Sequence, residues 1–382
     1  MSPVLFFDSG CPAPYSLRTL EQAALGGTEA TVVRIAEALD ADVMQHNRTE
    51  PEGHYFPGAL PSGAAPRRSV RTPAGEAPQP REQRVDHLII LRDPRVIQPL
   101  CARFPGARPY LWLHDLVRPG SKRGRRLAAA ADTLARLGVT LVCVSDFQRA
   151  QAQAVLERAG VAQRVRAVTI YNPIDERLAA GGAAVDREKL IFLSSPNKGL
   201  PFALDAFQAV RHALPGMRLS IGSPGYKSLR RAGLDGPAAA RSGIEWLGPM
   251  PHARALGEVA SALCVFYPNF VLPETFGLVF AEASAVGTPV LTHDCGAAAE
   301  VLADPRQLLP VAPAARRYER TARLVPGALR PLLAARAERR GVFEPYVQRI
   351  RAWRTDRPRT VPDPRFGLAA VLERWRALLN AA

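Results

Sequence analysis

Hydrophobic and polar residues follow two alternating patterns along the first half of the chain. Short apolar runs are followed by longer segments whose apolar residues recur every three or four positions, as on one face of a helix. Strands are predicted over residues 4–7, 41–45, 87–91, 109–113, 139–144 and 165–170. Helices are predicted over residues 28–39, 125–137 and 145–160, the last with the capping-box pair Ser145 and Gln148 at its start. This alternation predicts a parallel sheet covered by helices.

The second half of the chain repeats the alternation. Strands are predicted over residues 190–193, 217–221, 244–247, 263–267 and 290–292. Helices are predicted over residues 200–214, 277–286, 312–354 (an Arg-rich stretch) and 366–379. The fold class is therefore α/β, with two doubly wound, Rossmann-like domains. Ligands of such sheets bind at the carboxyl ends of the strands, so we expect a substrate cleft between the two halves.

Breaks in the pattern indicate the domain boundaries. Residues 50–84 are rich in Pro, Gly and Arg and show no periodicity, which predicts a mobile surface insertion. Asn172-Pro173 and the Ala/Gly-rich stretch after them indicate a hinge. We expect an N-terminal domain over 1–172, a hinge over 173–189 and a C-terminal domain over 190–350.

Composition narrows the class of protein. The chain has 382 residues, enough for two domains of ordinary size, and no apolar run approaches the ~20 residues of a membrane helix. The N-terminus lacks the pattern of a signal peptide, so the protein is expected in the cytoplasm. The five cysteines are odd in number and have no C-x-x-C spacing, which indicates small core residues rather than a metal site or disulfides.

The formal net charge is +15, which favours anionic partners such as phosphates, acidic saccharides, anionic lipids or nucleic acid. Only four of the fifty basic residues are lysines, so the arginine excess also fits the codon bias of a GC-rich bacterial genome. The densest basic tract begins at Arg118 and runs to Arg126. It indicates either docking of an anionic acceptor or membrane surface, or an ordinary solvated loop.

The segment 268–301 is the most informative part of the chain. Glu274 and Glu282 flank Phe276-Gly277-Leu278, at the start of a predicted helix that is apolar on every side apart from Glu282. A buried carboxylate needs a partner, and a pair of ligand hydroxyls is a good candidate. Glu274 lies just before the helix N-terminus, where backbone N–H groups favour an anion such as a phosphate.

Other candidate residues follow predicted strands or precede helices. Ser194, Ser195 and Lys198 lie between a strand and a helix, where hydroxyls and an ammonium group can bind a diphosphate. Gly26, Gly27 and Thr28 precede the first long helix, and His114 ends a strand at the predicted cleft. Taken alone, the glycines could form an ordinary helix-starting turn, His114 a structural histidine and Lys198 a surface residue.

The segment 268–301 resembles the E-x7-E motif of the retaining GT-B glycosyltransferases of family 4, also called group 1. The resemblance includes the proline before Glu274, the Phe-Gly pair, the apolar run, Glu282, and the G-x-P-V end. It implies the GT-B fold, in which two Rossmann-like domains face a central cleft and residues 351–382 return to the N-terminal domain as a helix. The family's R-x4-K-G element matches only in its K-G part, because Leu193 occupies the arginine position. That departure puts in doubt how the phosphate charge is balanced.

The resemblance implies a transferase that moves a sugar from a nucleotide sugar to a saccharide or lipid-linked saccharide acceptor, with retention and without a metal ion. Surface polysaccharide or glycolipid assembly in a bacterium is the implied pathway, with peripheral contact to an anionic membrane. The implied catalytic residues are His114, Lys198 and Glu274. The implied donor-binding residues are Gly27, Ser194, Ser195, Lys198, Leu247, Phe276, Gly277, Leu278 and Glu282. The implied acceptor-side residues are Gly26, Thr28 and Arg118.

Three alternatives remain open from the sequence. One is a sugar-nucleotide epimerase of similar fold, which would release nucleotide without an acceptor. Another is a non-catalytic protein that binds nucleotide sugars or polyanions, which the missing arginine favours. A nucleic-acid binder rests on charge alone, and no RNA- or DNA-binding motif supports it, so no nucleic-acid partner is expected.

Overall fold

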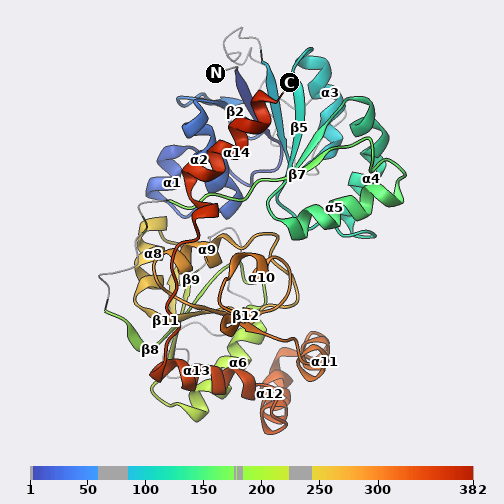
Figure 1. The fold of residues 1–382 in the computed structure, drawn as a ribbon. Helices are drawn as coiled ribbons and strands as arrows, with labels where there is room; N and C mark the ends of the chain where they lie inside the picture. Colours follow the sequence, from blue (N-terminus) through green and yellow to red (C-terminus); the bar gives the residue numbers. More distant parts are fainter. Residues whose placement is uncertain (1–2, 59–84, 176–177, 179–183, 223–242, 382) are drawn as a thin grey trace. The chain divides into compact units, whose positions relative to one another are not determined.

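The structure, a computed structural model, describes residues 3–58, 85–175, 178, 184–222 and 243–381. The chain forms two compact units. Unit 1 comprises Met1–Leu20, Leu25–Pro173 and Pro364–Ala382, and unit 2 comprises Glu21–Ala24 and Ile174–Asp363. The chain returns to unit 1 at Pro364, after the expected position at residue 351. Each unit contains a parallel sheet with helices packed on it (Figure 1).

The sheet of unit 1 has seven parallel strands in the order β3-β2-β1-β4-β5-β6-β7. Their bounds are Val4–Asp8 (β1), Asp42–Gln45 (β2), Tyr55–Pro57 (β3), His87–Leu91 (β4), Arg108–Leu113 (β5), Thr140–Cys143 (β6) and Ala167–Thr169 (β7). The prediction of a structureless insertion over 50–84 was wrong for β3, which pairs with β2 at the sheet edge. Three residues are too few to show a period, and residues 59–84 lie outside the described residues.

Alternating side chains of these strands pack against different helices, because successive residues of a strand point to opposite faces. The helices of this half are Leu17–Gln22 (α1), Gly27–Leu39 (α2), Ile97–Arg103 (α3), Lys122–Arg136 (α4), Asp146–Arg158 (α5) and Leu368–Asn380 (α14), with 3-10 turns at Pro94–Val96 (η1) and Pro364–Phe366 (η4). Leu5 and Phe7 lie in one core cluster with residues of α3, α4 and α5. On the other face, Phe6 and Trp112 contact Trp375 of α14, with ring centroids 6.3 and 4.9 Å away.

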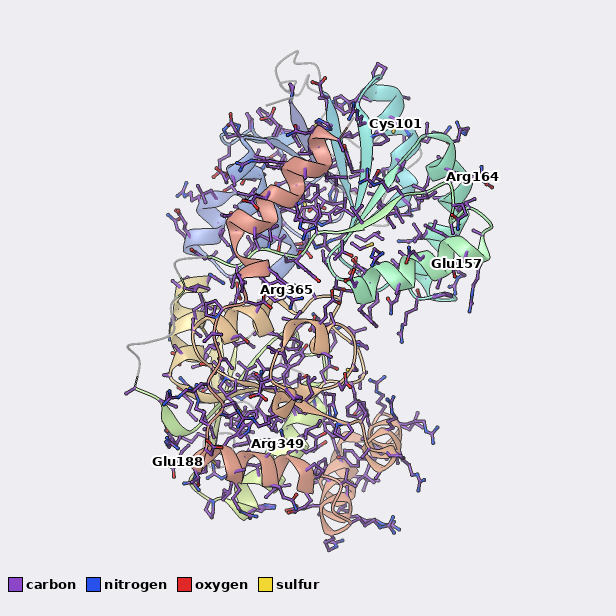
Figure 2. All side chains as sticks on the ribbon, viewed as in Figure 1. Cys101, Glu157, Arg164, Glu188, Arg349 and Arg365 are labelled. Atoms are coloured by element: carbon purple, nitrogen blue, oxygen red, sulfur yellow. The ribbon has the colours of Figure 1, made fainter. Side chains whose placement is uncertain are left out.

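Helix α14 therefore completes unit 1, although it comes last in the chain. It lies beside α2, and the turn before it is held by a ring contact between Tyr171 and Phe366 at 5.1 Å. Arg365, which is labelled in Figure 2, places its guanidinium 5.6 Å from the centre of the Tyr171 ring. These contacts explain why the segment beyond residue 363 belongs to unit 1.

The sheet of unit 2 has six parallel strands in the order β10-β9-β8-β11-β12-β13. Their bounds are Asp186–Leu193 (β8), Arg218–Gly222 (β9), Ile244–Gly248 (β10), Ala262–Phe266 (β11), Val290–His293 (β12) and Leu308–Leu309 (β13). The helices are Leu200–Ala213 (α6), His252–Ala260 (α8), Leu278–Ala285 (α9), Ala298–Val301 (α10), Pro313–Ala322 (α11), Arg330–Arg339 (α12) and Glu344–Thr355 (α13), with 3-10 turns at Pro305–Gln307 (η2) and Gly327–Leu329 (η3). The single helical stretch predicted over 312–354 is three helices, interrupted near Pro326 and Gly341.

Candidate functional site

The strand order of unit 2 brings two predicted site segments together. Strand β8 lies between β9 and β11, so the chain winds outward in opposite directions from the β8/β11 pair. Ligands of doubly wound sheets bind at such a switch point, beyond the carboxyl ends of the strands. Lys198 follows β8 and Glu274 follows β11, so both lie at this position.

Lys198 and Glu274 form a two-point ion pair. The Lys198 Nζ lies 2.9 Å from Oε1 and 2.8 Å from Oε2 of Glu274. The Tyr267 hydroxyl donates a 2.5 Å hydrogen bond to the same Oε1. Burial, reinforced by the charge of Glu274, raises the pKa of Tyr267 well above its usual value, so this phenol remains a donor. The Lys198 side chain is 32% exposed and the Glu274 side chain only 10%, so solvent or a ligand can reach the ammonium.

The two serines of the β8–α6 loop have different roles. The Ser194 hydroxyl lies 3.2 Å from the Tyr267 hydroxyl and so belongs to the Glu274 network. Ser195 is buried, donates to the side-chain oxygen of Asn197 at 2.6 Å, and its carbonyl accepts from the Lys198 N–H at 2.9 Å. Ser195 therefore shapes the turn that presents Lys198.

Helix α9 starts beside Glu274 on a glycine that the backbone requires. Gly277 has φ +88°, and a Cβ atom there would lie 2.5 Å from the Phe280 ring. Phe276 is buried and Leu278 is the first helical residue. Glycine has no side chain to cap the helix, which leaves its first N–H groups for an anion.

Glu282 has a protein partner that the sequence did not reveal. The Glu282 side chain is 10% exposed, and its Oε1 lies 2.7 Å from Nε2 of His252, the first residue of α8. The expected partner was a pair of ligand hydroxyls, whereas the structure supplies an imidazole. His252, thirty positions upstream, could not be predicted as the partner because nothing in the sequence shows that α8 packs against α9.

The acceptor-side candidates and His114 lie in unit 1. Gly26 caps α2, Gly27 and Thr28 form its first turn, and Arg118 lies exposed in the loop before α4. His114 is buried against Trp112, with ring centroids 4.5 Å apart. Burial, and then the charge of Arg92, holds the pKa of His114 well below its usual value, so the imidazole is neutral.

A charged cavity of about 210 Å³ lies beside these residues in unit 1. It is lined by Ser9, Gly10, Arg92, Asp93, Pro94, Arg95, Leu113, Asp115, Val117, Arg123, Arg126 and Leu127. Arg92 follows β4, has φ +63°, and its Nη2 lies 2.9 Å from Glu29 Oε1 of α2. Sequence reasoning missed Arg92 and Glu29, because sixty-three positions separate them.

Known proteins are similar to this chain in the segment that carries the site. Residues 187–324, which include the Lys198–Glu274 pair and Glu282, match the family model described as Glycosyl transferases group 1. The phosphatidyl-myo-inositol mannosyltransferase of Mycobacterium tuberculosis is 29% identical over 207 residues, which are 49% of this chain and 54% of that protein. Over these residues the chain is similar to the group 1 glycosyltransferases. It spans about half the length of the curated relatives it matches.

Solved structures share the fold of this chain. Sucrose-phosphate synthase from Thermosynechococcus elongatus has a TM-score of 0.60 at 16% identity, and 100% of both chains is covered. WaaG, a glycosyltransferase involved in lipopolysaccharide biosynthesis, has a TM-score of 0.54 at 14% identity, with 99% of this chain and 100% of that chain covered. The two-domain GT-B fold expected from the sequence is confirmed.

Two further positions singled out by the resemblance lie in strands of unit 2. Leu193, where the family has arginine, is paired with Gly222, and a Cβ atom on Gly222 would lie 2.4 Å from Leu193 Cδ2. An apolar side chain packed on glycine therefore replaces the cation. Leu247 is half-buried in β10, where the pairing register with β9 shifts between Trp246 and Gly248.

None of the helices in the described part of the chain has the length and apolar character needed to span a membrane. Within the same residues, no group of three or more His, Cys, Asp or Glu side chains could hold a metal ion.

Proposed function

We propose that this protein transfers a sugar from a nucleoside-diphosphate donor to an acceptor hydroxyl with retention of anomeric configuration. The Lys198–Glu274 pair at the β8/β11 switch point carries the proposal. A cation and a carboxylate held together at the carboxyl ends of parallel strands can bind a diphosphate and the sugar attached to it.

The leaving diphosphate gains negative charge as the sugar–oxygen bond breaks. The Lys198 ammonium would turn from Glu274 to the diphosphate and stabilise that charge. The N-terminus of α9, starting at Leu278, would contribute its backbone N–H groups to the same phosphates. Because these groups supply positive charge, we propose a reaction that needs no metal ion.

The two carboxylates would then bind hydroxyl groups on either side of the diphosphate. Glu274, released by Lys198 and still held by Tyr267, would accept hydrogen bonds from the donor sugar. Glu282 would accept from the ribose, and His252 would orient its carboxylate through the 2.7 Å contact. His252 is thus a positioning residue rather than a catalytic one.

On the acceptor side, His114 would act as a neutral hydrogen-bonding group near the reacting centre, because its pKa is held well below neutrality by burial and Arg92. Arg118 and the start of α2 at Gly26, Gly27 and Thr28 would contact the acceptor. We propose that the enzyme works in the cytoplasm, where its net charge of +15 favours contact with an anionic membrane surface.

The relatives suggest which substrates to test first. Those named phosphatidyl-myo-inositol mannosyltransferases suggest a mannosyl donor and a lipid-linked acceptor. We therefore propose glycolipid or surface polysaccharide assembly in a bacterium as the pathway.

Ligand-induced thermal stabilisation tests the donor site, because a ligand that binds only the folded state raises the free energy of unfolding. Nucleoside diphosphates and their mannose conjugates, one for each base, are added to the wild type and to Glu282→Gln. Glu258→Gln is the matched control, since it removes a carboxylate of the same unit that pairs with Lys189 instead. We expect the nucleotides of one base to stabilise the wild type and Glu258→Gln. The same nucleotides should lose most of their stabilising effect in Glu282→Gln.

Transfer is then measured with the donor identified in this way. The product's anomeric configuration, read by NMR coupling constants, should equal that of the donor. Release of nucleotide without any acceptor would favour the epimerase reading instead. Absence of stabilisation by every nucleotide, together with protection by a polyanion, would refute the transferase proposal.

A further inference from the structure

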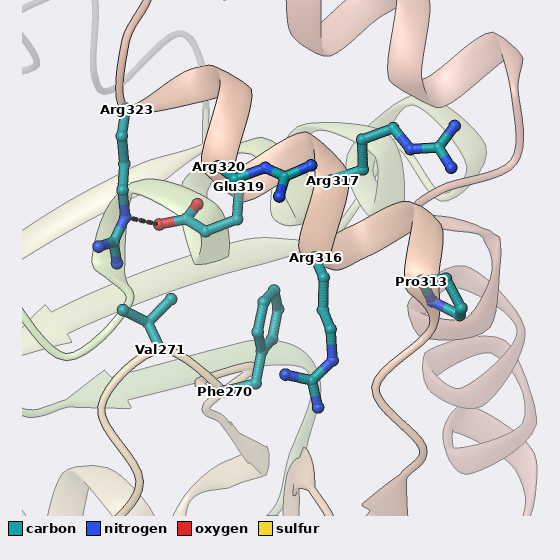
Figure 3. A pocket seen from close by; sticks show the side chains of 8 residues that line it. All are labelled: Phe270, Val271, Pro313, Arg316, Arg317, Glu319, Arg320 and Arg323. Atoms are coloured by element: carbon teal, nitrogen blue, oxygen red, sulfur yellow. Dashed lines mark hydrogen bonds and ion pairs between the residues drawn. The ribbon is translucent and has the colours of Figure 1, made fainter.

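A second, strongly basic pocket lies in unit 2, outside the Lys198–Glu274 site. Its volume is about 500 Å³. Helix α11 forms one wall, and the loop between β11 and α9 forms the floor through Phe270 and Val271 (Figure 3). The lining residues are Phe270, Val271, Pro313, Arg316, Arg317, Glu319, Arg320 and Arg323.

The charges in this pocket are not balanced. Four arginines line it together with one carboxylate, Glu319. Glu319 Oε1 lies 3.0 Å from Arg323 Nε, one turn further along α11. Among the described residues, Arg316, Arg317 and Arg320 have no ion pair. Like charges on one helix repel each other, so binding of an anion lowers the free energy of the site.

The remaining oxygen of Glu319 indicates a second feature of the ligand. The Glu319 side chain is only 10% exposed, and its Oε2 is buried without a hydrogen-bond partner in the described structure. A buried, unsatisfied carboxylate oxygen is costly and is satisfied by a donor such as a hydroxyl. An anion that carries hydroxyls beside its charge would satisfy both the arginines and this oxygen.

The floor of the pocket connects it to the proposed donor site. Phe270 contacts Phe202 of α6 at 5.1 Å and His293 of β12 at 4.9 Å between ring centroids. The neighbouring Asn269 side chain accepts from the N–H groups of Val271 and Leu272, which keeps this loop in one conformation. The same short loop ends at Glu274. A ligand in contact with Phe270 and Val271 would therefore contact the segment that carries the donor-site carboxylate.

We propose that this pocket is a separate binding site for a phosphate group that carries neighbouring hydroxyls, as in a polyol phosphate. The arginines of α11 would bind the phosphate, Glu319 would accept from a hydroxyl, and Phe270 would pack against the polyol carbons. Such a phosphate occurs in a lipid headgroup or in a free phosphorylated saccharide. The site does not depend on the proposed transferase activity, since none of its residues belongs to the donor site.

Binding of glycerol phosphate, measured by isothermal titration calorimetry, tests the site. The double variant Arg316→Gln/Arg320→Gln removes two charges from the pocket. The matched control, Arg336→Gln/Arg339→Gln, removes two charges from exposed arginines of the next helix, α12. We expect binding at least about tenfold weaker in the pocket variant and unchanged in the control, since charged hydrogen bonds are lost only in the former.

Two further variants test the chemistry of the site. Glycerol phosphate should bind more tightly than inorganic phosphate in the wild type, and Glu319→Ala should remove that preference. Lys198→Met should bind glycerol phosphate as the wild type does. Equal weakening in both arginine variants, loss of binding in Lys198→Met, or absence of binding in the wild type would overturn the proposal.

Vesicle sedimentation distinguishes the source of the phosphate. Phosphatidylcholine vesicles with and without phosphatidylglycerol are compared, because the phosphatidylglycerol headgroup is itself a polyol phosphate. If the source is lipid, the pocket variant should bind the anionic vesicles about 30-fold more weakly than the α12 control. If both variants bind the vesicles equally and only glycerol phosphate distinguishes them, the source is a free phosphorylated saccharide.

Discussion

Replacing Lys198 with Met should affect both folding stability and donor binding. The change leaves the Glu274 carboxylate, 10% exposed, with the Tyr267 hydroxyl but without its cation. Exposed ion pairs contribute about 0.2–1 kcal/mol, and loss of one partner from a fully buried pair costs about 3–5 kcal/mol. Since the Lys198 side chain is 32% exposed, the cost here should lie between, at about 1–3 kcal/mol in the free energy of unfolding.

The effect on donor binding should be separable from the effect on stability. Charged hydrogen bonds contribute about 1.5–3 kcal/mol each, so kcat/KM for the nucleotide sugar should fall about 10- to 150-fold. Lys189→Met is the matched control, because Lys189 forms a similar pair with Glu258, at 2.6 Å, away from the switch-point loops of the same sheet. It should lower the free energy of unfolding, measured by urea denaturation, and leave kcat/KM unchanged.

The double variant Lys198→Met/Glu274→Gln sharpens the test. Removing the uncompensated carboxylate should recover part of the lost stability without restoring transfer. The reasoning fails if Lys198→Met leaves kcat/KM intact, or if Lys189→Met reduces it to the same extent. Either result would show that the ion pair is a structural contact and does not bind the donor.

Other predictions concern the scaffold around the site. Burial lowers the pKa of His293 to about 4, below the value of about 6.5 in an unfolded chain, so its contribution to stability is complete above pH 6.5 and is lost as the pH falls towards 4. Urea denaturation across this range should show a loss of about 3 kcal/mol that is much smaller in His293→Gln, and an equal loss in the variant would contradict the assignment. Trp375→Ala should lower the free energy of unfolding by about 3–5 kcal/mol, because the ring is fully buried against Phe6; a change below 1 kcal/mol would mean that α14 is not part of the core. Gly277→Ala should cost about 1–3 kcal/mol and weaken nucleotide binding, since the left-handed backbone and the Phe280 ring both oppose a Cβ atom; unaltered calorimetric binding would remove the start of α9 from the site.

Most of the local structure could be predicted from the order of the amino acids. Buried parallel strands appear as apolar runs, so both ends of the strand His87–Leu91 could be predicted correctly. The predicted start of α5 is confirmed, because the Ser145 hydroxyl accepts from the Gln148 N–H at 3.0 Å. The Gln148 side chain also accepts from the Val144 N–H and donates to the Asp115 carbonyl. These signals succeed because a cap or a strand depends on residues a few positions apart.

Which residues of the site meet depends on how the strands and helices pack together. Glu282 needed a partner on burial grounds, but that its partner is His252 depends on α8 packing against α9. Lys198 and Glu274 lie seventy-six positions apart and meet because β8 and β11 are neighbours at the switch point. The sequence marks an apolar run as a strand without recording its neighbour, since many strand orders would bury the same side chains equally well. Pairing across a sheet is decided by the packing of the whole unit, and the chemistry of the site follows from that packing.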